Sequence, residues 1–142
     1  MSTEQNKTIV RRFYDELLNQ ENKAVIDEIF DDEVTIYDPF TGVTKGADSF
    51  RQLINIFDTA FPGHRVMVQQ VVAEGDFVSV LHTHLATHTG PFMGLPGTGK
   101  EIKVEGIELF RLRNGRIVEF WRKDDNVSLL IQLGIMPPPA MA

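Results

Sequence analysis

The sequence predicts an α+β fold, in which a curved and mainly antiparallel sheet wraps around N-terminal helices as a cone-shaped barrel. Two observations carry this prediction. Apolar residues recur at helical spacing in residues 1–61, and from residue 65 onward they alternate along four long runs. Tight-turn residues separate neighbouring runs, so the strands should form a meander that follows the helices.

Three helices are expected in the first part of the chain. The first follows a capping signal formed by Ser2 and Gln5, the second begins at Asn22, and the third covers residues 46–61. Between the second and third helices, residues 34–38 should form a strand that stops before a proline.

The second part of the chain should consist of strands. Four strands are expected, at residues 65–73, 76–88, 101–113 and 116–124. Gly75 and the Asn114-Gly115 pair are the turn residues that join neighbouring strands. A short helix at residues 127–133 should close the base of the cone.

The composition indicates one domain at residues 1–136 and a proline-rich tail at residues 137–142. The net charge of −6 makes nucleic acid and anionic membrane unfavourable partners. The chain has no cysteine, which excludes disulfide and thiol chemistry. No apolar signal segment or run of transmembrane length is present, so we expect a cytoplasmic protein.

Three polar residues should face the inside of the cone. Tyr14 lies on the core side of the first helix, Asp38 ends the first strand, and Glu108 shares a strand face with Phe110. Burying an unpaired carboxylate is costly, which would favour the neutral acid form of Glu108. The alternatives are a half-buried helix tyrosine, an aspartate that caps a turn, and a glutamate on the solvent face of its strand.

Several short motifs follow one another along the chain. They are Phe61-Pro62, Glu74-Gly75-Asp76, Thr87-His88-Thr89-Gly90, residues 96–100, residues 115–119, Trp121 and Gln132-Leu133-Gly134. With this order and spacing, the chain resembles the SnoaL-like polyketide cyclases, a branch of the nuclear transport factor two-like superfamily. The resemblance implies intramolecular aldol closure in an apolar pocket without a cofactor.

The same resemblance implies a catalytic role for Asp125. Counted back from Gln132-Leu133-Gly134, Asp125 stands where these cyclases carry their general acid/base aspartate. The alternative is that Asp125 caps the last helix, although Asp124 could equally be the cap with Asp125 facing inward. These cyclases pair the aspartate with a pocket histidine, which strand residues 107–111 do not contain.

A second resemblance concerns the ketosteroid isomerases. Tyr14, Asp38 before a proline, and Glu108 ahead of Phe110 and Arg111 match that family at three places, with glutamate replacing its aspartate. This implies that Asp38 removes a proton, while Tyr14 and Glu108 stabilise the enolate. A third possibility is a binding protein without chemistry.

Five further residues should contact a small hydrophobic ligand that contains a carbonyl group. They are His88, Trp121, Tyr37, Phe92 and Phe57. His88 is either a pocket residue or an anchor for the next loop, Trp121 either a pocket wall or core, and Phe92 part of a rim over the pocket.

Metal and nucleotide sites are not expected. His82, His84 and His88 are spread along one strand without evident converging partners, so we predict no metal. Residues 94–100 nearly spell a phosphate-binding loop, but Glu101 follows where serine or threonine should stand, and the loop joins two strands.

The outer face of the sheet should carry Ile107 and Leu109. Exposed, such residues would form an apolar patch, which favours a homodimer through the sheet.

Overall fold

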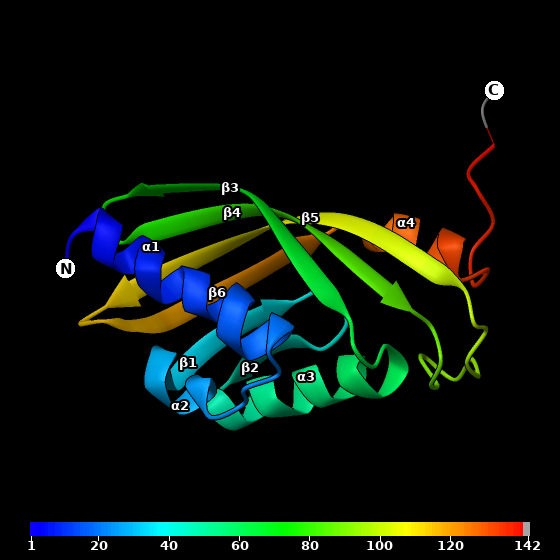
Figure 1. The fold of residues 1–142 in the computed structure, drawn as a ribbon, viewed down its shortest axis with the longest axis horizontal. Coiled ribbons are helices and arrows are strands. Elements are labelled where there is room, and N and C mark those ends of the chain that lie inside the picture. Colours follow the sequence, from blue (N-terminus) through cyan, green and yellow to red (C-terminus); the bar gives the residue numbers. More distant parts are fainter. Residues whose placement is uncertain (141–142) are drawn as a thin grey trace.

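The computed structural model describes residues 1–140 and confirms the α+β prediction (Figure 1). The helical elements are α1 (Thr3–Arg12), the π-helix η1 (Phe13–Asn19), α2 (Val25–Ile29), α3 (Ala47–Ala60) and α4 (Asn126–Gln132). The strands are β1 (Phe30–Asp38), β2 (Gly42–Lys45), β3 (Arg65–Glu74), β4 (Phe77–Thr87), β5 (Glu101–Arg113) and β6 (Arg116–Asp124).

The six strands form one curved sheet in the order β2-β1-β6-β5-β4-β3. Every neighbouring pair is antiparallel except β1 and β6, which run parallel. The outer strands β2 and β3 are not paired with each other, so the sheet stays open where a barrel was expected. Helices α1 to α3 lie along one side of the sheet (Figure 1).

Local sequence signals account for most of the boundaries. At the start of α1, the Gln5 amide donates to Ser2 Oγ at 3.1 Å and the Ser2 amide donates to Gln5 Oε1 at 2.8 Å. This reciprocal pair is the expected capping box. The hairpin turns are made by Gly75, Asn114 and Gly115, which all have positive φ.

Four elements differ from the prediction. The second helix, α2, begins at Val25 and not at Asn22. The first helix continues as the π-helix η1, whose wider turns bury Phe13, Tyr14, Leu17 and Leu18 together. The first strand starts at residue 30 and not at residue 34. It pairs with the short strand β2, which was not predicted because the sequence of β2 is exposed and half polar. Short edge strands carry little apolar periodicity, which explains the omission.

The core divides into two apolar clusters on the helix side of the sheet. The larger cluster contains Phe13, Phe30, Phe50, Phe110 and Phe120. The smaller cluster lies toward α4 and contains Phe61, Phe92 and Leu129. No helix in residues 1–140 is long and apolar enough to cross a membrane. Residues 137–140 of the predicted tail form no helix or strand, and Met141 and Ala142 lie outside the described residues.

Candidate functional site

A pocket lies between the two apolar clusters. The empty space in the pocket and at its mouth is about 700 Å³, and this volume includes open solvent. Phenylalanine and aliphatic side chains make most of its wall, including Phe13, Phe50, Phe57, Phe61 and Phe120. The polar side chains that reach it are His64, His84, Glu108, Arg122, Asp124 and Asn126. A mostly apolar cavity with a few convergent polar groups is typical of a small-molecule site.

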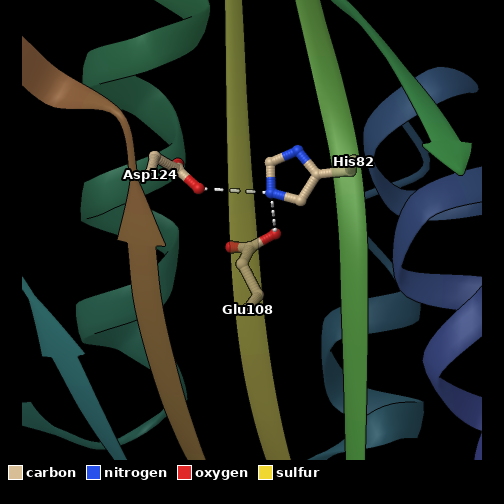
Figure 2. A group of neighbouring side chains, drawn as sticks. All are labelled: His82, Glu108 and Asp124. Carbon is tan, nitrogen blue, oxygen red and sulfur yellow. Dashed lines mark ion pairs between the residues drawn. The ribbon is translucent and has the colours of Figure 1, made fainter. Parts of the chain in front are cut away.

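Three side chains from adjacent strands converge on one another (Figure 2), and two of them line this pocket. His82 comes from β4, Glu108 from β5 and Asp124 from β6. His82 Nε2 lies 2.9 Å from Glu108 Oε1 and 3.2 Å from Asp124 Oδ1. Both are ion-pair contacts, and neither meets the geometric criteria of a hydrogen bond. His82 itself is fully buried, and the two carboxylates are the groups that reach the pocket.

Arg122 holds the carboxylates from the other side. Its guanidinium donates to Asp124 Oδ2 at 2.6 Å and to Asp38 Oδ2 at 2.5 Å, and its Nε lies 3.6 Å from Glu108 Oε2. The guanidinium also lies over the ring of Phe57, 4.7 Å from its centroid. Tyr14, on η1, donates to Glu108 Oε1 at 2.8 Å.

The electrostatics of this network fix its protonation. Burial alone would lower the pKa of His82, but its contacts with Asp124 and Glu108 and their charges raise it to about 10. Burial alone would raise the pKa of Asp124, but His82 and Arg122 hold it well below its usual range. Burial and the charge of Glu108 raise the pKa of Tyr14 well above its usual value. At neutral pH the site therefore contains an imidazolium beside an aspartate carboxylate, with a neutral phenol as donor.

His84 has the opposite character, although it is only two residues away. Burial and the nearby charges of His82 and His64 lower its pKa to about 3. His64 contacts Asp58 at 2.8 Å through Nε2 and packs 5.4 Å from the ring of His84. His84 is thus a neutral imidazole in the pocket wall.

The acids predicted from the sequence occupy different positions. Asp125 is exposed and caps α4, accepting from the Ser128 amide at 3.0 Å, while Asp124 turns inward. The structure therefore reverses the predicted alternative in which Asp125 faces inward and Asp124 caps the helix. Asp38 is buried, but Oδ1 accepts from the amides of Phe40 and Thr41, and Oδ2 accepts from Arg122. Tyr14 and Glu108 do meet, with the Tyr14 hydroxyl as donor and the Glu108 carboxylate as acceptor.

The predicted ligand contacts separate into pocket and non-pocket residues. Phe57 lines the pocket. Phe92 is buried against Phe57 and Phe61 in the smaller cluster, outside the pocket wall. His88 anchors the loop that follows, through a 2.9 Å contact between its Nδ1 and Thr98 Oγ1.

Tyr37 and Trp121 lie elsewhere. Their rings stack on each other, 4.9 Å apart and almost parallel, and neither residue is part of the pocket wall. They occupy the outer side of the sheet, because their strand neighbours Ile36, Phe120 and Arg122 point inward.

The convergence of His82, Glu108 and Asp124 also bears on metal binding. Their three ligand-type atoms lie within 4.8 Å of one another, so His82 does have the converging partners that its own strand does not supply. However, Arg122 already supplies a positive charge, and the proton on His82 occupies the nitrogen that a metal would need. The absence of a metal stays a prediction, which elemental analysis of the dialysed protein would test.

Sequence reasoning missed His82, Arg122 and Asp124 as site residues. The available signal was strand alternation, since Arg122 and Asp124 share the inward face with Phe120, and His82 shares it with Val80. Alternation does not give the register between strands, which places His82 and Asp124 on either side of Gly106, and Arg122 beside Glu108.

Comparison with known proteins identifies the family. The sequence profile of the SnoaL-like polyketide cyclases matches residues 8–133. None of the curated proteins compared with the chain matches it. Among solved structures, a provisionally assigned SnoaL-like polyketide cyclase from Jannaschia sp. CCS1 superposes with a TM-score of 0.88. It is 24% identical, over 96% of this chain and 95% of that one, which shows a shared fold.

Two Streptomyces proteins are also similar. IdmH from Streptomyces antibioticus, provisionally assigned as a polyketide cyclase, is 28% identical with a TM-score of 0.79, over 92% of this chain and 99% of that one. AclR from Streptomyces galilaeus, provisionally assigned as a hydroxylase, is 26% identical with a TM-score of 0.86, over 98% of this chain and 87% of that one. With the profile match spanning most of its length, the chain belongs to the SnoaL-like polyketide cyclase family.

Proposed function

We propose that this protein is a cofactor-free general acid/base enzyme acting on a small hydrophobic carbonyl compound, by aldol-type ring closure. The observation that carries the proposal is the position of His82 Nε2, 2.9 and 3.2 Å from oxygens of the two carboxylates that reach the pocket. A proton on this nitrogen can pass to either carboxylate, so the site can accept a proton at one and return it at the other.

The proposed reaction consists of proton removal, C–C bond formation and proton return. Asp124 removes a proton from the carbon beside the ligand carbonyl, and the electron pair of that C–H bond becomes the enolate. The enolate carbon then attacks a second carbonyl of the same molecule and forms the new C–C bond. His82 passes its proton to Glu108, and Glu108 delivers that proton to the resulting alkoxide. The proton taken up by Asp124 then returns to His82, which restores the starting state of an imidazolium between two carboxylates. Arg122 stays charged throughout and stabilises the oxyanions.

The test is exchange of the α-hydrogens of 2-tetralone, a bicyclic ketone, for deuterium in D₂O, followed by NMR. Asp124→Asn should lower the exchange rate by about a hundredfold to ten-thousandfold, because it removes the base at nearly unchanged shape. The matched control is Asp125→Asn, which changes the adjacent acid in the same way and should keep the wild-type rate, since asparagine caps helices as well as aspartate. An equal loss in Asp125→Asn alone would return the catalytic role to Asp125.

A ketosteroid-isomerase-like reaction is the second candidate, favoured by the buried 2.8 Å contact between Tyr14 and Glu108. Asp38 accepts three hydrogen bonds and is not part of the pocket wall, which argues against Asp38 as the base. Isomerisation of a β,γ-unsaturated ketosteroid by the wild type, lost in Asp38→Asn and kept in Asp124→Asn, would establish this alternative. Binding of 2-tetralone without any exchange would favour a binding protein.

We also propose that two copies pair through the outer face of the sheet. This face carries an outer apolar patch made of Phe77, Leu81, Leu85, Ile107, Leu109 and Trp121. Ile107 is 50% exposed and Phe77 41% exposed at the middle and end of adjacent strands. Contiguous exposed apolar residues of this kind are typical of protein interfaces.

A further inference from the structure

Gly106 stands in the middle of the longest strand of the sheet. In the register of β5, it pairs with His82 on β4 and with Asp124 on β6. It therefore lies directly between the two residues whose side chains meet. A glycine inside a strand weakens that strand and often marks a place where another group approaches closely. Its neighbours on the inward face, Val104 and Glu108, both carry side chains.

The approach at Gly106 is unusually close. A β-carbon added to Gly106 would lie 2.1 Å from Asp124 Oδ1 and 2.9 Å from both Cγ and Cα of Asp124. These distances are below van der Waals contact, and the nearest obstacle is the carboxylate itself. The carboxylate of Asp124 thus occupies the space that any other residue at 106 would fill.

The missing side chain at Gly106 explains how two residues on non-adjacent strands come together. Neighbouring strands lie about 4.8 Å apart, so the backbones of His82 and Asp124 are separated by roughly twice that distance. Their side chains nevertheless come within 3.2 Å, and both extend over the strand β5 that lies between them (Figure 2). Gly106 pairs with both residues and places no side chain in their way. Glu108, one inward position further along β5, then reaches the same imidazole nitrogen.

We propose that Gly106 is a positioning residue. Because it has no side chain, it leaves room above β5 for the Asp124 carboxylate to lie against His82. The catalytic consequence rests on the proposed acid/base function, whereas the positioning itself is a property of the folded protein. Five ionisable side chains face His82 or its carboxylate partners from the surrounding elements: Tyr14, His84, Glu108, Arg122 and Asp124. Displacing Asp124 removes one of the two carboxylates in contact with the imidazole.

The first experiment is an NMR titration of the His82 ring in Gly106→Ala, without any ligand. The variant should lower the pKa of His82 by about 1 to 3 pH units, because one of its two anionic partners is pushed away. Asp124→Asn should lower it to a similar extent, and the double variant should add little further, since both changes remove the same contact. Glu105→Ala, at the exposed neighbour of Gly106, is the control and should leave the His82 titration unchanged. An unchanged His82 titration in Gly106→Ala would overturn the proposal.

A second experiment covers the case in which Gly106→Ala folds poorly. The melting temperature is measured for Gly106→Ala in the wild-type background and in an Asp124→Ala background. If the obstacle is the carboxylate, alanine at 106 should lower the melting temperature clearly less once Asp124 has been shortened. An equal loss in both backgrounds would mean that Gly106 serves strand packing alone, and would also overturn the proposal.

The tetralone exchange assay separates this inference from the proposed function. A lowered His82 pKa in Gly106→Ala together with wild-type exchange would support the positioning role and reject the acid/base function. A lowered His82 pKa together with a hundredfold or greater loss of exchange supports both.

Discussion

Two histidines of β4 respond to the same fold in opposite ways. His82 lies between two carboxylates and is held protonated, with its pKa raised to about 10. His84, two residues along the same face, is surrounded by apolar walls and other histidines, and its pKa falls to about 3. Burial alone disfavours the charged form of both rings. The charged form is stabilised only at His82, where carboxylates lie beside the ring.

Stability should therefore decline on both sides of about pH 6.5, the ordinary histidine value. Above it, folded His82 keeps a proton that the unfolded chain has lost, so the free energy of unfolding falls by up to about 1.4 kcal/mol per pH unit until pH 10. Below it, the unfolded chain protonates His84 while the folded protein does not until about pH 3, so stability falls again.

Urea denaturation between pH 5 and 9 measures both limbs. His82→Gln should flatten the alkaline limb, and His84→Gln should flatten the acid limb above the range where carboxylates titrate. Each variant is the control for the other, since they lie on one strand and change the same residue type. An alkaline limb of undiminished slope in His82→Gln would show that His82 is not the group that retains the proton.

At this scale the sequence predicts part of the site. Tyr14 and Glu108 follow from helix and strand periodicity, because each is surrounded along the chain by core residues. Asp124 and Asp125 are harder to distinguish, since a change of one residue at the end of a strand reverses which side chain faces inward. His82 and Arg122 become recognisable only once β4, β5 and β6 are aligned in register.

Among the elements, the loop between β4 and β5 has the clearest anchor. The Gly99 amide donates to the His88 carbonyl at 2.7 Å, and the His88 amide donates to the Lys100 carbonyl at 2.8 Å. The Thr98 hydroxyl completes this clamp by its 2.9 Å contact with His88 Nδ1. The buried imidazole therefore ties both ends of the loop together.

Thr98→Val keeps the shape of the side chain and removes its hydroxyl. It should cost about 1 kcal/mol of stability, through the lost hydrogen bond to a buried histidine. Amide hydrogen exchange should accelerate in residues 89–99 while β6 stays protected. Thr87→Val, a neighbouring threonine with no side-chain hydrogen bond among residues 1–140, is the control. Unchanged exchange of the loop amides in Thr98→Val would mean that the backbone bonds alone hold the loop.

The helices and long strands could be predicted because their signals are local. Capping residues, glycine turns and alternation fix α1, α3 and the hairpins from β3 to β6 to within one or two residues. The π-helix and β2 could not, because neither has a distinctive sequence pattern: η1 contains ordinary helix-forming residues, and β2 is defined by its pairing with β1.

For the whole molecule, the prediction concerns self-association. If two copies pair through the outer apolar patch, the wild type should have twice the monomer mass of 16.1 kDa, and Ile107→Glu should have the monomer mass, because it buries a charge in the interface. Sedimentation or light scattering measures this. Ile56→Glu makes the same change at a 46% exposed isoleucine on α3, away from the patch, and should leave the mass unchanged. A monomeric wild type would contradict the proposal.

The parallel pairing of β1 with β6 has a consequence for how the chain is made. Each of the strands β3 to β6 pairs with the next strand along the chain, whereas the bond between Asp38 and Arg122 links residues 84 positions apart. During synthesis, β1 and β2 emerge early and have no sheet to join until the final strand leaves the ribosome. Such long-range pairing is slow and leaves apolar surface uncovered in the meantime. A chain that stops before residue 116 could still pair β3, β4 and β5 in order. It would leave the β1–β2 hairpin and the Asp38 carboxylate without β6, the strand that joins them to the sheet.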